Sequence, residues 1–364
     1  GVRMICSQLG GFLAVSVPGV IMQFTGKDNS FTYTLTGLIF SCVFCIAVFI
    51  TWYTPWEAKD VHQEYDFKVD NQRGSGLGNH LKYLVLDLFS SFRIRAFRLH
   101  IIIYIFSFTA MDVFGSVFTY YVVYCLSQDA AAVSGWLSIA AFASVPGTYG
   151  FMLLLNRLNM TPSAALRFSY SCIFLVLAFL FTVYLTKTEV PTLLFSAVFI
   201  LLGAARSGLY YIPWNIYSFI PDIDEIVTQQ RREGIFAGVM VLTRKSTVAI
   251  AIMIIGLVLQ ESGFVKGSGA QPESALGAII GLMIFATAAL LAVSFFATYR
   301  FKLTRETHKV LLKEIARRKL GGDYRDCDAD TRVVIKQLTG YEYDQVWGGD
   351  ATRLAVGANL STVK

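Results

Sequence analysis

Charged residues are scarce in this sequence. Only 15% of its 364 residues are Asp, Glu, Lys or Arg, whereas 55% are hydrophobic and the mean hydropathy is +0.55. Soluble domains carry roughly a quarter charged residues, so the composition excludes an ordinary soluble globular domain. The lipid bilayer is therefore the solvent for most of the chain and its first expected partner.

Histidine and cysteine are also few, with four and six residues respectively, and they are scattered along the chain. Cys42 and Cys45 have C-x-x-C spacing. They lie in an apolar stretch, however, where a thiol lacks the electropositive, accessible setting that redox or metal chemistry needs. No metal-ligand spacing and no Ser/His/Asp set at a membrane face is visible, so we expect neither an enzyme nor a metal or cofactor site.

Long apolar stretches dominate what remains. A membrane-spanning helix needs about 20 apolar residues. None of the stretches alternates strictly between apolar and polar residues, which favours helices over barrel strands. The candidate spans are residues 4–24, 32–54, 99–126, 131–155, 164–186, 190–220, 234–260 and 274–299.

Basic residues predict the orientation. An even number of spans places Arg3 and the C-terminal tail on one side, and the loops on that side contain most of the Lys and Arg residues. The opposite loops contain only Lys27, Lys187 and Lys266. By the positive-inside rule we expect a multi-pass protein of the cell (inner) membrane with a cytoplasmic C-terminus. The net charge of +6 follows from this bias and gives no reason to expect nucleic-acid binding.

The chain divides into four parts. Residues 1–56 hold two spans, 57–98 a polar central loop, 99–299 six spans, and 300–364 a polar tail. Within the loop, residues 80–98 predict an amphipathic helix that lies on the membrane face or packs against the span ends. In the tail, we expect a basic helix over 304–320 and a second helix over 330–339, in a solvated extension with a regulatory or partner role as the alternative.

An arrangement of two spans, a long loop and six spans is typical of part of a transporter, because transporters are often built from six-helix halves joined by a long loop. Residues 99–299 would be a complete second half, and the two leading spans the end of a first half. We therefore expect four further helices upstream of Gly1 in the natural protein.

A charged segment separates the sixth and seventh of these spans. It runs from Pro213-Trp214 through Asp222-Ile-Asp224-Glu225 and Arg231-Arg232-Glu233-Gly234 to Lys245. In order and spacing it resembles helix 10, the following loop and helix 11 of the glycoside–pentoside–hexuronide:cation symporters, the melibiose-permease branch of the major facilitator superfamily. The exit from the second span through Pro55-Trp56-Glu57 also resembles this family.

The resemblance implies an all-α, major-facilitator-like bundle of about eight transmembrane helices, monomeric at full length. It implies symport of a sugar, glycoside or sugar acid coupled to Na+ or H+, by alternating access. The family's cation-coordinating aspartates lie on helices that this chain lacks, and the family often has an acidic residue where Phe219 stands. Lys245 matches a helix 11 lysine that faces the central cavity near the cation site.

Four charged residues are predicted at membrane depth, where ionised groups are costly and are usually functional. Lys245 lies about 16 Å along its helix from Gly234 and is a candidate mobile countercharge. Asp112 is a candidate for coupling or for a structural pair with Lys245, Arg244 or Arg206. Arg206 could bind an anionic sugar or form a packing salt bridge, and Arg244 could hold a polar network or contact the solute.

Aromatic residues could form the flat faces that sugar binding uses. Trp214, Tyr210 and Tyr211 lie on a helix that we expect Pro213 to interrupt. Further candidates at the outer end of another span, with an interfacial belt as their alternative role, are Tyr120, Tyr121 and Tyr124.

The charges between these spans could form a cytoplasmic gate that opens during alternating access, or could simply be a solvated loop with weak ion pairs. They are Asp222, Asp224, Glu225, Arg231, Arg232 and Glu233. Two other functions remain open: a carrier of another amphiphile or organic anion, as lysolipid carriers are, and a non-transporting membrane sensor or scaffold.

Overall fold

The computed structural model describes residues 5–7, 9–13, 17, 21, 30–54, 88–128, 130–187, 190–229 and 231–347. Every regular element within these ranges is a helix. The predicted all-α class is confirmed.

Seven helical rods are long and apolar enough to cross a membrane. They match the last seven predicted spans within a few residues, whereas most of the predicted span 4–24 and residues 55–87 of the loop lie outside the described residues. The rods are α2 (Ser30–Tyr53), α5 (Arg95–Tyr120) with the π-helical turn η1 (Tyr121–Cys125), α6 (Ala130–Asn156), α7 (Pro162–Thr186), α8 (Thr192–Tyr217), α10 (Glu233–Glu261), and the continuous run of α11 (Glu273–Ile280), η2 (Gly281–Ala286) and α12 (Thr287–Arg300).

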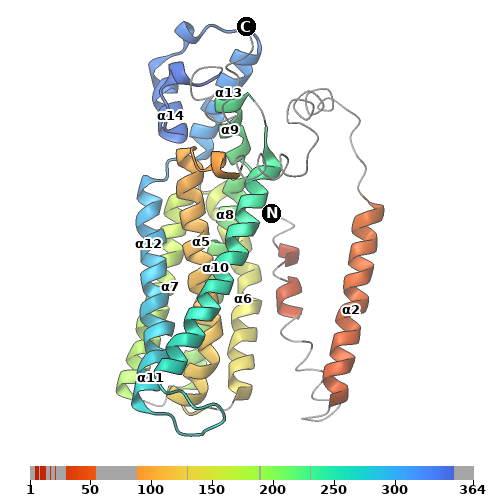
Figure 1. The fold of residues 1–364 in the computed structure, drawn as a ribbon, viewed down its shortest axis with the longest axis vertical. Helices are drawn as coiled ribbons and strands as arrows, with labels where there is room; N and C mark the ends of the chain where they lie inside the picture. The colour runs from red at the N-terminus through yellow and green to blue at the C-terminus, as the bar shows by residue number, and fades with distance from the viewer. Residues whose placement is uncertain are drawn as a thin grey trace.

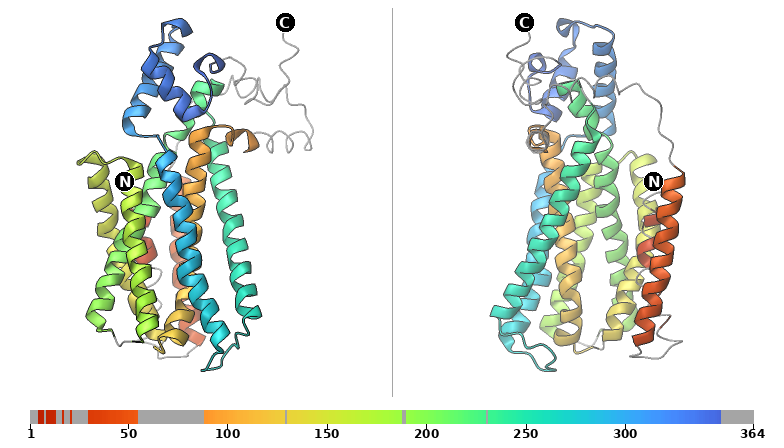
Figure 2. Two further views of the ribbon diagram at one scale, coloured as in Figure 1. Left: turned by 90° about the vertical axis from the view of Figure 1, so that its left-hand side faces the viewer. Right: turned by 45° about the vertical axis from the view of Figure 1, so that its right-hand side comes forward.

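Six of these rods form one bundle around α5, and α2 stands to one side of it (Figure 1). Helix α5 packs against α12, α10 and α8, while α8 also packs against α6 and α7. Figure 2 shows the same bundle from two further sides. No described side chain of α2 is buried, whereas α5 is the most buried rod. Consequently α5 presents side chains to several neighbours at once.

Small residues bring α6 and α8 unusually close together. A Cβ added at Gly203 would lie 2.0 Å from the carbonyl oxygen of Ala140, and one at Gly147 would lie 2.7 Å from the Cα of Ala204. Such contacts are possible only without side chains, as is common between transmembrane helices. The small residues just before Arg206 on α8 therefore allow this close packing.

Helix α8 is not interrupted at Pro213, contrary to our expectation, because it continues through this residue to Tyr217. A proline removes one backbone hydrogen bond and usually bends a helix. Here Pro213 is buried, and its helix packs against α6 and α7. Trp214 therefore projects from a continuous helix.

The charged segment after α8 is a helix and not the loop we predicted. Helix α9 (Ile220–Thr228) begins with Pro221 in its first turn, and all nine of its residues are buried. It lies at the end of the bundle that also carries the tail, which we call the tail-side end (Figure 1).

Two tail helices are confirmed: α13 (Arg305–Lys319) and α14 (Ala329–Thr339). Thr304 caps the first through its side chain, and Gly321 follows it with a φ of +85°. The predicted solvated extension is wrong for these residues, because both helices pack against α9 (Figures 1 and 2). Apolar side chains on their inner faces, such as Leu311 and Leu338, are buried there.

Candidate functional site

Asp112 and Arg244 form an ion pair between α5 and α10, each near the middle of its helix. Nη1 of Arg244 lies 2.5 Å from Oδ2 of Asp112, and Nη2 donates to Oδ1 at 2.9 Å. A two-point contact of this kind fixes both side chains and offsets the cost of placing each charge in an apolar setting. The Arg244 and Asp112 side chains are 19% and 24% exposed, so the pair is partly buried, and the contacting Nη1 and Oδ2 atoms are buried within it.

An aromatic ring supports each of the two arginines near this level. The guanidinium carbon of Arg244 lies 5.2 Å from the ring centre of Phe108, and that of Arg206 lies 5.1 Å from the ring centre of Tyr210. The two rings contact each other edge to face, with their centres 4.6 Å apart. Cation–π contacts of this kind orient guanidinium groups and stabilise them in partly apolar surroundings.

Within the described residues, the side chain of Arg206 contacts the side chain of Tyr210. Its Nη2 donates to the Tyr210 hydroxyl at 3.0 Å, one helical turn away on α8. No carboxylate in the described ranges lies within ion-pair distance, so the packing salt bridge considered for Arg206 is not found there.

The rings continue as a row toward the tail-side end. Tyr104 contacts Phe108 at 4.5 Å between ring centres and Trp214 at 6.0 Å, and Trp214 contacts Tyr217 at 5.8 Å. Tyr104, Phe108 and Asp112 share one face of α5 because they are four residues apart. A row of aromatic faces beside charged hydrogen-bonding groups is the combination that binds sugars.

Lys245 is exposed, and it has no ion pair within the part of the chain that the structure describes. It follows Arg244 directly, so its side chain leaves α10 about 100° around the helix from the Asp112–Arg244 pair. The two neighbouring cations therefore point in different directions. Gly238 and Gly256 share the face of α10 with Lys245, and a Cβ would meet nothing within 4 Å at Gly256.

The other predicted tyrosines lie elsewhere. Tyr121 is completely buried and donates to the carbonyl of Leu180 at 2.7 Å, so its hydroxyl is not free for a solute and we no longer include it in the site. Tyr120 and Tyr124 stack on each other and contact Phe264 edge to face, at the end of the bundle opposite the tail.

Tyr211 is only 3% exposed and accepts a hydrogen bond of 3.5 Å from Asn215. These contacts leave Tyr210 and Trp214 as the predicted aromatic residues beside the charged groups.

Asp224 is the most buried of the charged residues on α9. It is 0% exposed and accepts hydrogen bonds from Nε and Nη2 of Arg232 at 2.8 and 2.7 Å. Arg232 also donates to the Ser90 hydroxyl at 3.0 Å. This buried pair connects α9, the start of α10 and the segment before α5, and it is far stronger than a solvated loop pair.

The remaining carboxylates of α9 face the tail. Nε2 of His308 lies 2.7 Å from Oδ2 of Asp222, and Nζ of Lys319 lies 2.5 Å from Oε1 of Glu225. Arg231 is half exposed, 3.5 Å from Asp222 and 2.7 Å from Glu233. The six predicted gate residues are therefore close together, but two of them bind tail residues that the sequence did not suggest.

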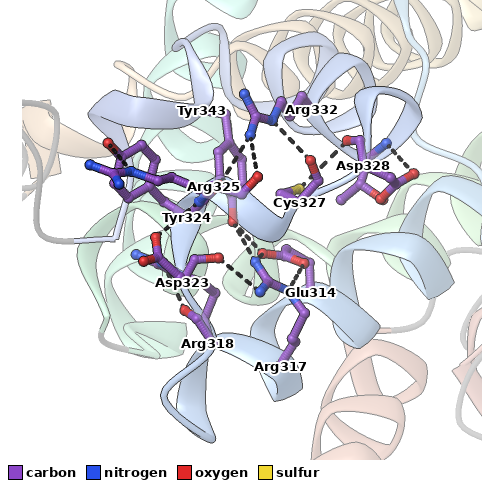
Figure 3. A network of polar contacts seen from close by, with 12 residues as sticks. Glu314, Arg317, Arg318, Asp323, Tyr324, Arg325, Cys327, Asp328, Arg332 and Tyr343 are labelled. Atoms are coloured by element: carbon purple, nitrogen blue, oxygen red, sulfur yellow. Dashed lines mark hydrogen bonds and ion pairs between the residues drawn. The ribbon is translucent and has the colours of Figure 1, made fainter.

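A second polar network holds the tail together (Figure 3). Arg317 donates to both oxygens of the Glu314 carboxylate at 2.9 and 2.8 Å, and the hydroxyl of Tyr343 binds the same carboxylate. Burial alone would raise the pKa of Glu314, but the hydrogen bonds from Arg317 and Tyr343 outweigh it and lower the pKa. Burial, reinforced by the bond to Glu314, raises the pKa of Tyr343.

Sequence reasoning missed Tyr104, Phe108, His308 and Lys319. The four-residue spacing that aligns Tyr104 and Phe108 with Asp112 was a usable signal. The two tail residues had none, because their partners are about 90 positions away in the sequence. No three His, Cys, Asp or Glu side chains gather as a metal site would require within the described residues.

The bundle, its mid-helix charges and its row of aromatic rings define a multi-pass membrane protein of the transporter class. Residues 1–305 match the family described as MFS/sugar transport protein. The chain belongs to this major facilitator family of sugar transporters, as its resemblance to the melibiose-permease branch implied.

One similar protein is an uncharacterized symporter of Synechocystis sp. (strain ATCC 27184 / PCC 6803 / Kazusa). It is 28% identical over 263 residues, which are 70% of this chain and 47% of the relative. The chain thus aligns with about half the length of this relative.

Proposed function

We propose that this chain forms part of a secondary active transporter that couples the entry of a sugar, glycoside or sugar acid to Na+ or H+ by alternating access. The observation that carries the proposal is the contact between Phe108 and Tyr210, which places the Asp112–Arg244 pair beside Arg206. Three helices thereby contribute charged groups to one region near mid-bundle. The relative's name, a symporter, supports the coupling.

In this proposal the partly exposed rings of the row bind the apolar face of the solute, and the charged groups bind its polar edge, while Tyr104 and Phe108 are buried and support these rings from within the bundle. Trp214 and Tyr210 offer ring faces, while Arg206 donates hydrogen bonds to hydroxyl or carboxylate oxygens. Asp112 and Arg244 exchange their mutual contact for contacts with the solute or a proton. We propose that these groups line a water-filled chamber between the helices, and that Lys245, which leaves α10 about 100° around from the pair, is a mobile countercharge at the edge of this chamber, near the coupling cation.

Coupling follows if the charge of this chamber must be balanced before the helices can move. An unbalanced charge is costly where water is excluded, so a state with only the solute or only the cation changes conformation slowly. The α9 charges then act as a gate at the tail-side end. We propose that this end is cytoplasmic, from the predominance of basic residues in its loops, and that the full-length protein is monomeric.

Vesicle uptake by the full-length protein tests the proposal. An inward Na+ or H+ gradient is expected to drive accumulation of a labelled hexose glycoside or hexuronic acid, and dissipating that gradient abolishes it. Accumulation independent of either gradient, or of an unrelated amphiphile that sugars do not compete with, would support the other carrier class. Absence of uptake for every solute would favour a sensor or scaffold.

A further inference from the structure

Helix α9 is the direct connection between the two helices that carry most of the candidate site. Helix α8, with Arg206 and Trp214, ends at Tyr217, and α10, with Arg244 and Lys245, begins at Glu233. Any relative movement of the tail-side ends of α8 and α10 must therefore move or deform α9. Whatever holds α9 in place restrains both helices.

The tail supplies much of what holds α9. The carboxylates of Asp222 and Glu225 belong to residues only 5% and 8% exposed, and α13 gives each of them a partner, His308 and Lys319 respectively. Buried carboxylates without partners would be costly. The docked tail thus supplies Glu225 with its partner and Asp222 with a second one beside Arg231, so that both carboxylates can be buried beneath it.

Two further contacts reinforce this docking. The ring of His308 stacks on Phe219, the residue before α9, with ring centres 4.2 Å apart. At the other end of α9, the backbone N–H of Trp347 donates to the carbonyl of Ile226 at 3.0 Å. That carbonyl lies in the last turn of α9, where helix carbonyls lack partners within the helix. Both ends of α9 are therefore held by the tail.

The tail can act as one unit because its own parts are joined. Glu314, Arg317 and Tyr343 connect α13 to the segment after α14 (Figure 3). Gly340, with a φ of +88°, fits against Arg95 at the start of α5, where an added Cβ would lie 3.2 Å from the Arg95 Cβ. The tail thus lies between α9 and the central helix of the bundle.

We propose that residues 305–347 form a clamp on α9, and that releasing this clamp frees the tail-side ends of α8 and α10 to move. The clamp is a conformational device built into the fold. It consists of the His308–Asp222 and Lys319–Glu225 contacts, the stacking on Phe219 and the Trp347 hydrogen bond. Its test needs no solute.

Hydrogen–deuterium exchange of the full-length protein in lipid nanodiscs tests the clamp. The double variant His308→Ala/Lys319→Ala is compared with Lys309→Ala/Lys313→Ala, which removes two exposed lysines of α13 that have no ion pair within the described residues. In the first variant, the amide hydrogens of α9, the last turn of α8 and the first turn of α10 are expected to exchange about tenfold faster than in the wild type. The second is expected to leave these amides unchanged.

A milder variant, His308→Phe, retains a ring against Phe219 but no nitrogen for Asp222, and it keeps the test valid if the double variant does not fold. It is expected to accelerate α9 exchange severalfold. Faster exchange in α13 and α14 with α9, α8 and α10 unchanged would overturn the proposal, because the tail would then merely rest on α9. Equal acceleration in the lysine control would overturn it as well.

Discussion

Asp112 on α5 and Arg244 on α10 are 132 positions apart in the sequence, yet both carboxylate oxygens face both terminal guanidinium nitrogens. Removing one partner leaves a single charge at membrane depth. Asp112→Asn and Arg244→Gln are each expected to lower the free energy of unfolding by about 3 kcal/mol. Thermal unfolding in detergent measures the loss.

The double variant Asp112→Asn/Arg244→Gln distinguishes a purely structural ion pair from one that is also needed for transport. With both charges gone, most of the stability should return, while cation-driven uptake should remain lost. Recovery of uptake together with stability would show that the pair only holds α5 to α10.

Tyr210 is expected to orient Arg206 for the solute. Tyr210→Phe keeps the ring beneath the guanidinium but removes the hydroxyl that accepts its hydrogen bond at 3.0 Å. We expect the KM for the transported solute to rise about fivefold, since one such bond contributes about 1 kcal/mol. Tyr217→Phe is the control on the same helix, because the Tyr217 hydroxyl donates to the Glu233 carbonyl at the tail-side end; an equal rise in KM there would contradict the assignment.

The α6–α8 contact predicts a position that tolerates no side chain. Gly203→Ala would place a Cβ 2.0 Å from the Ala140 carbonyl oxygen, whereas at Gly150 on α6 the same change meets nothing within 4 Å. Gly203→Ala should destabilise the bundle by about 3 kcal/mol, the upper range for overpacking, and Gly150→Ala by much less. Similar melting temperatures for the two variants would exclude the close approach of these helices.

The tail should have a stability window set by Glu314 and Tyr343. The folded pKa of Glu314 is lowered, so its contribution is complete above the ordinary value of 4.5 and is lost as the pH falls through the folded pKa. The folded pKa of Tyr343 is raised, so its contribution is complete below the ordinary value of 10.0 and is lost as the pH rises toward the folded pKa.

We therefore expect the contribution of this network to tail protection, measured by hydrogen exchange as the difference between wild type and Tyr343→Phe and corrected for intrinsic rates, to be constant between these two values and to fall outside them. In Tyr343→Phe the alkaline limb should weaken. If protection of the tail amides were greatest only at acidic pH or only at alkaline pH, the result would be inconsistent with this network.

The sequence predicted what depends on local pattern, and missed what depends on distant partners. The positions of the membrane-spanning helices followed from the length of the apolar stretches, because this signal lies within one continuous segment. Pro213 misled us because packing against neighbouring helices overrides its local effect. Asp112 was recognisable as a buried charge, but its choice of Arg244 over Arg206 or Lys245 depends on how α5 faces α10. The docking of His308 on Asp222 depends on the whole tail and had no local signal.

The central claim is that the mid-bundle charges face a watery chamber that solutes enter, and Lys245 tests it most directly. In the full-length protein with its native cysteines replaced, Lys245→Cys is compared with Ile254→Cys, nine residues on and therefore about 180° around α10. The account predicts rapid reaction of position 245 with a membrane-impermeant, hydrophilic thiol reagent, slowed by transported solute, and little reaction at 254. Reaction of position 245 only with a lipid-soluble reagent would contradict it.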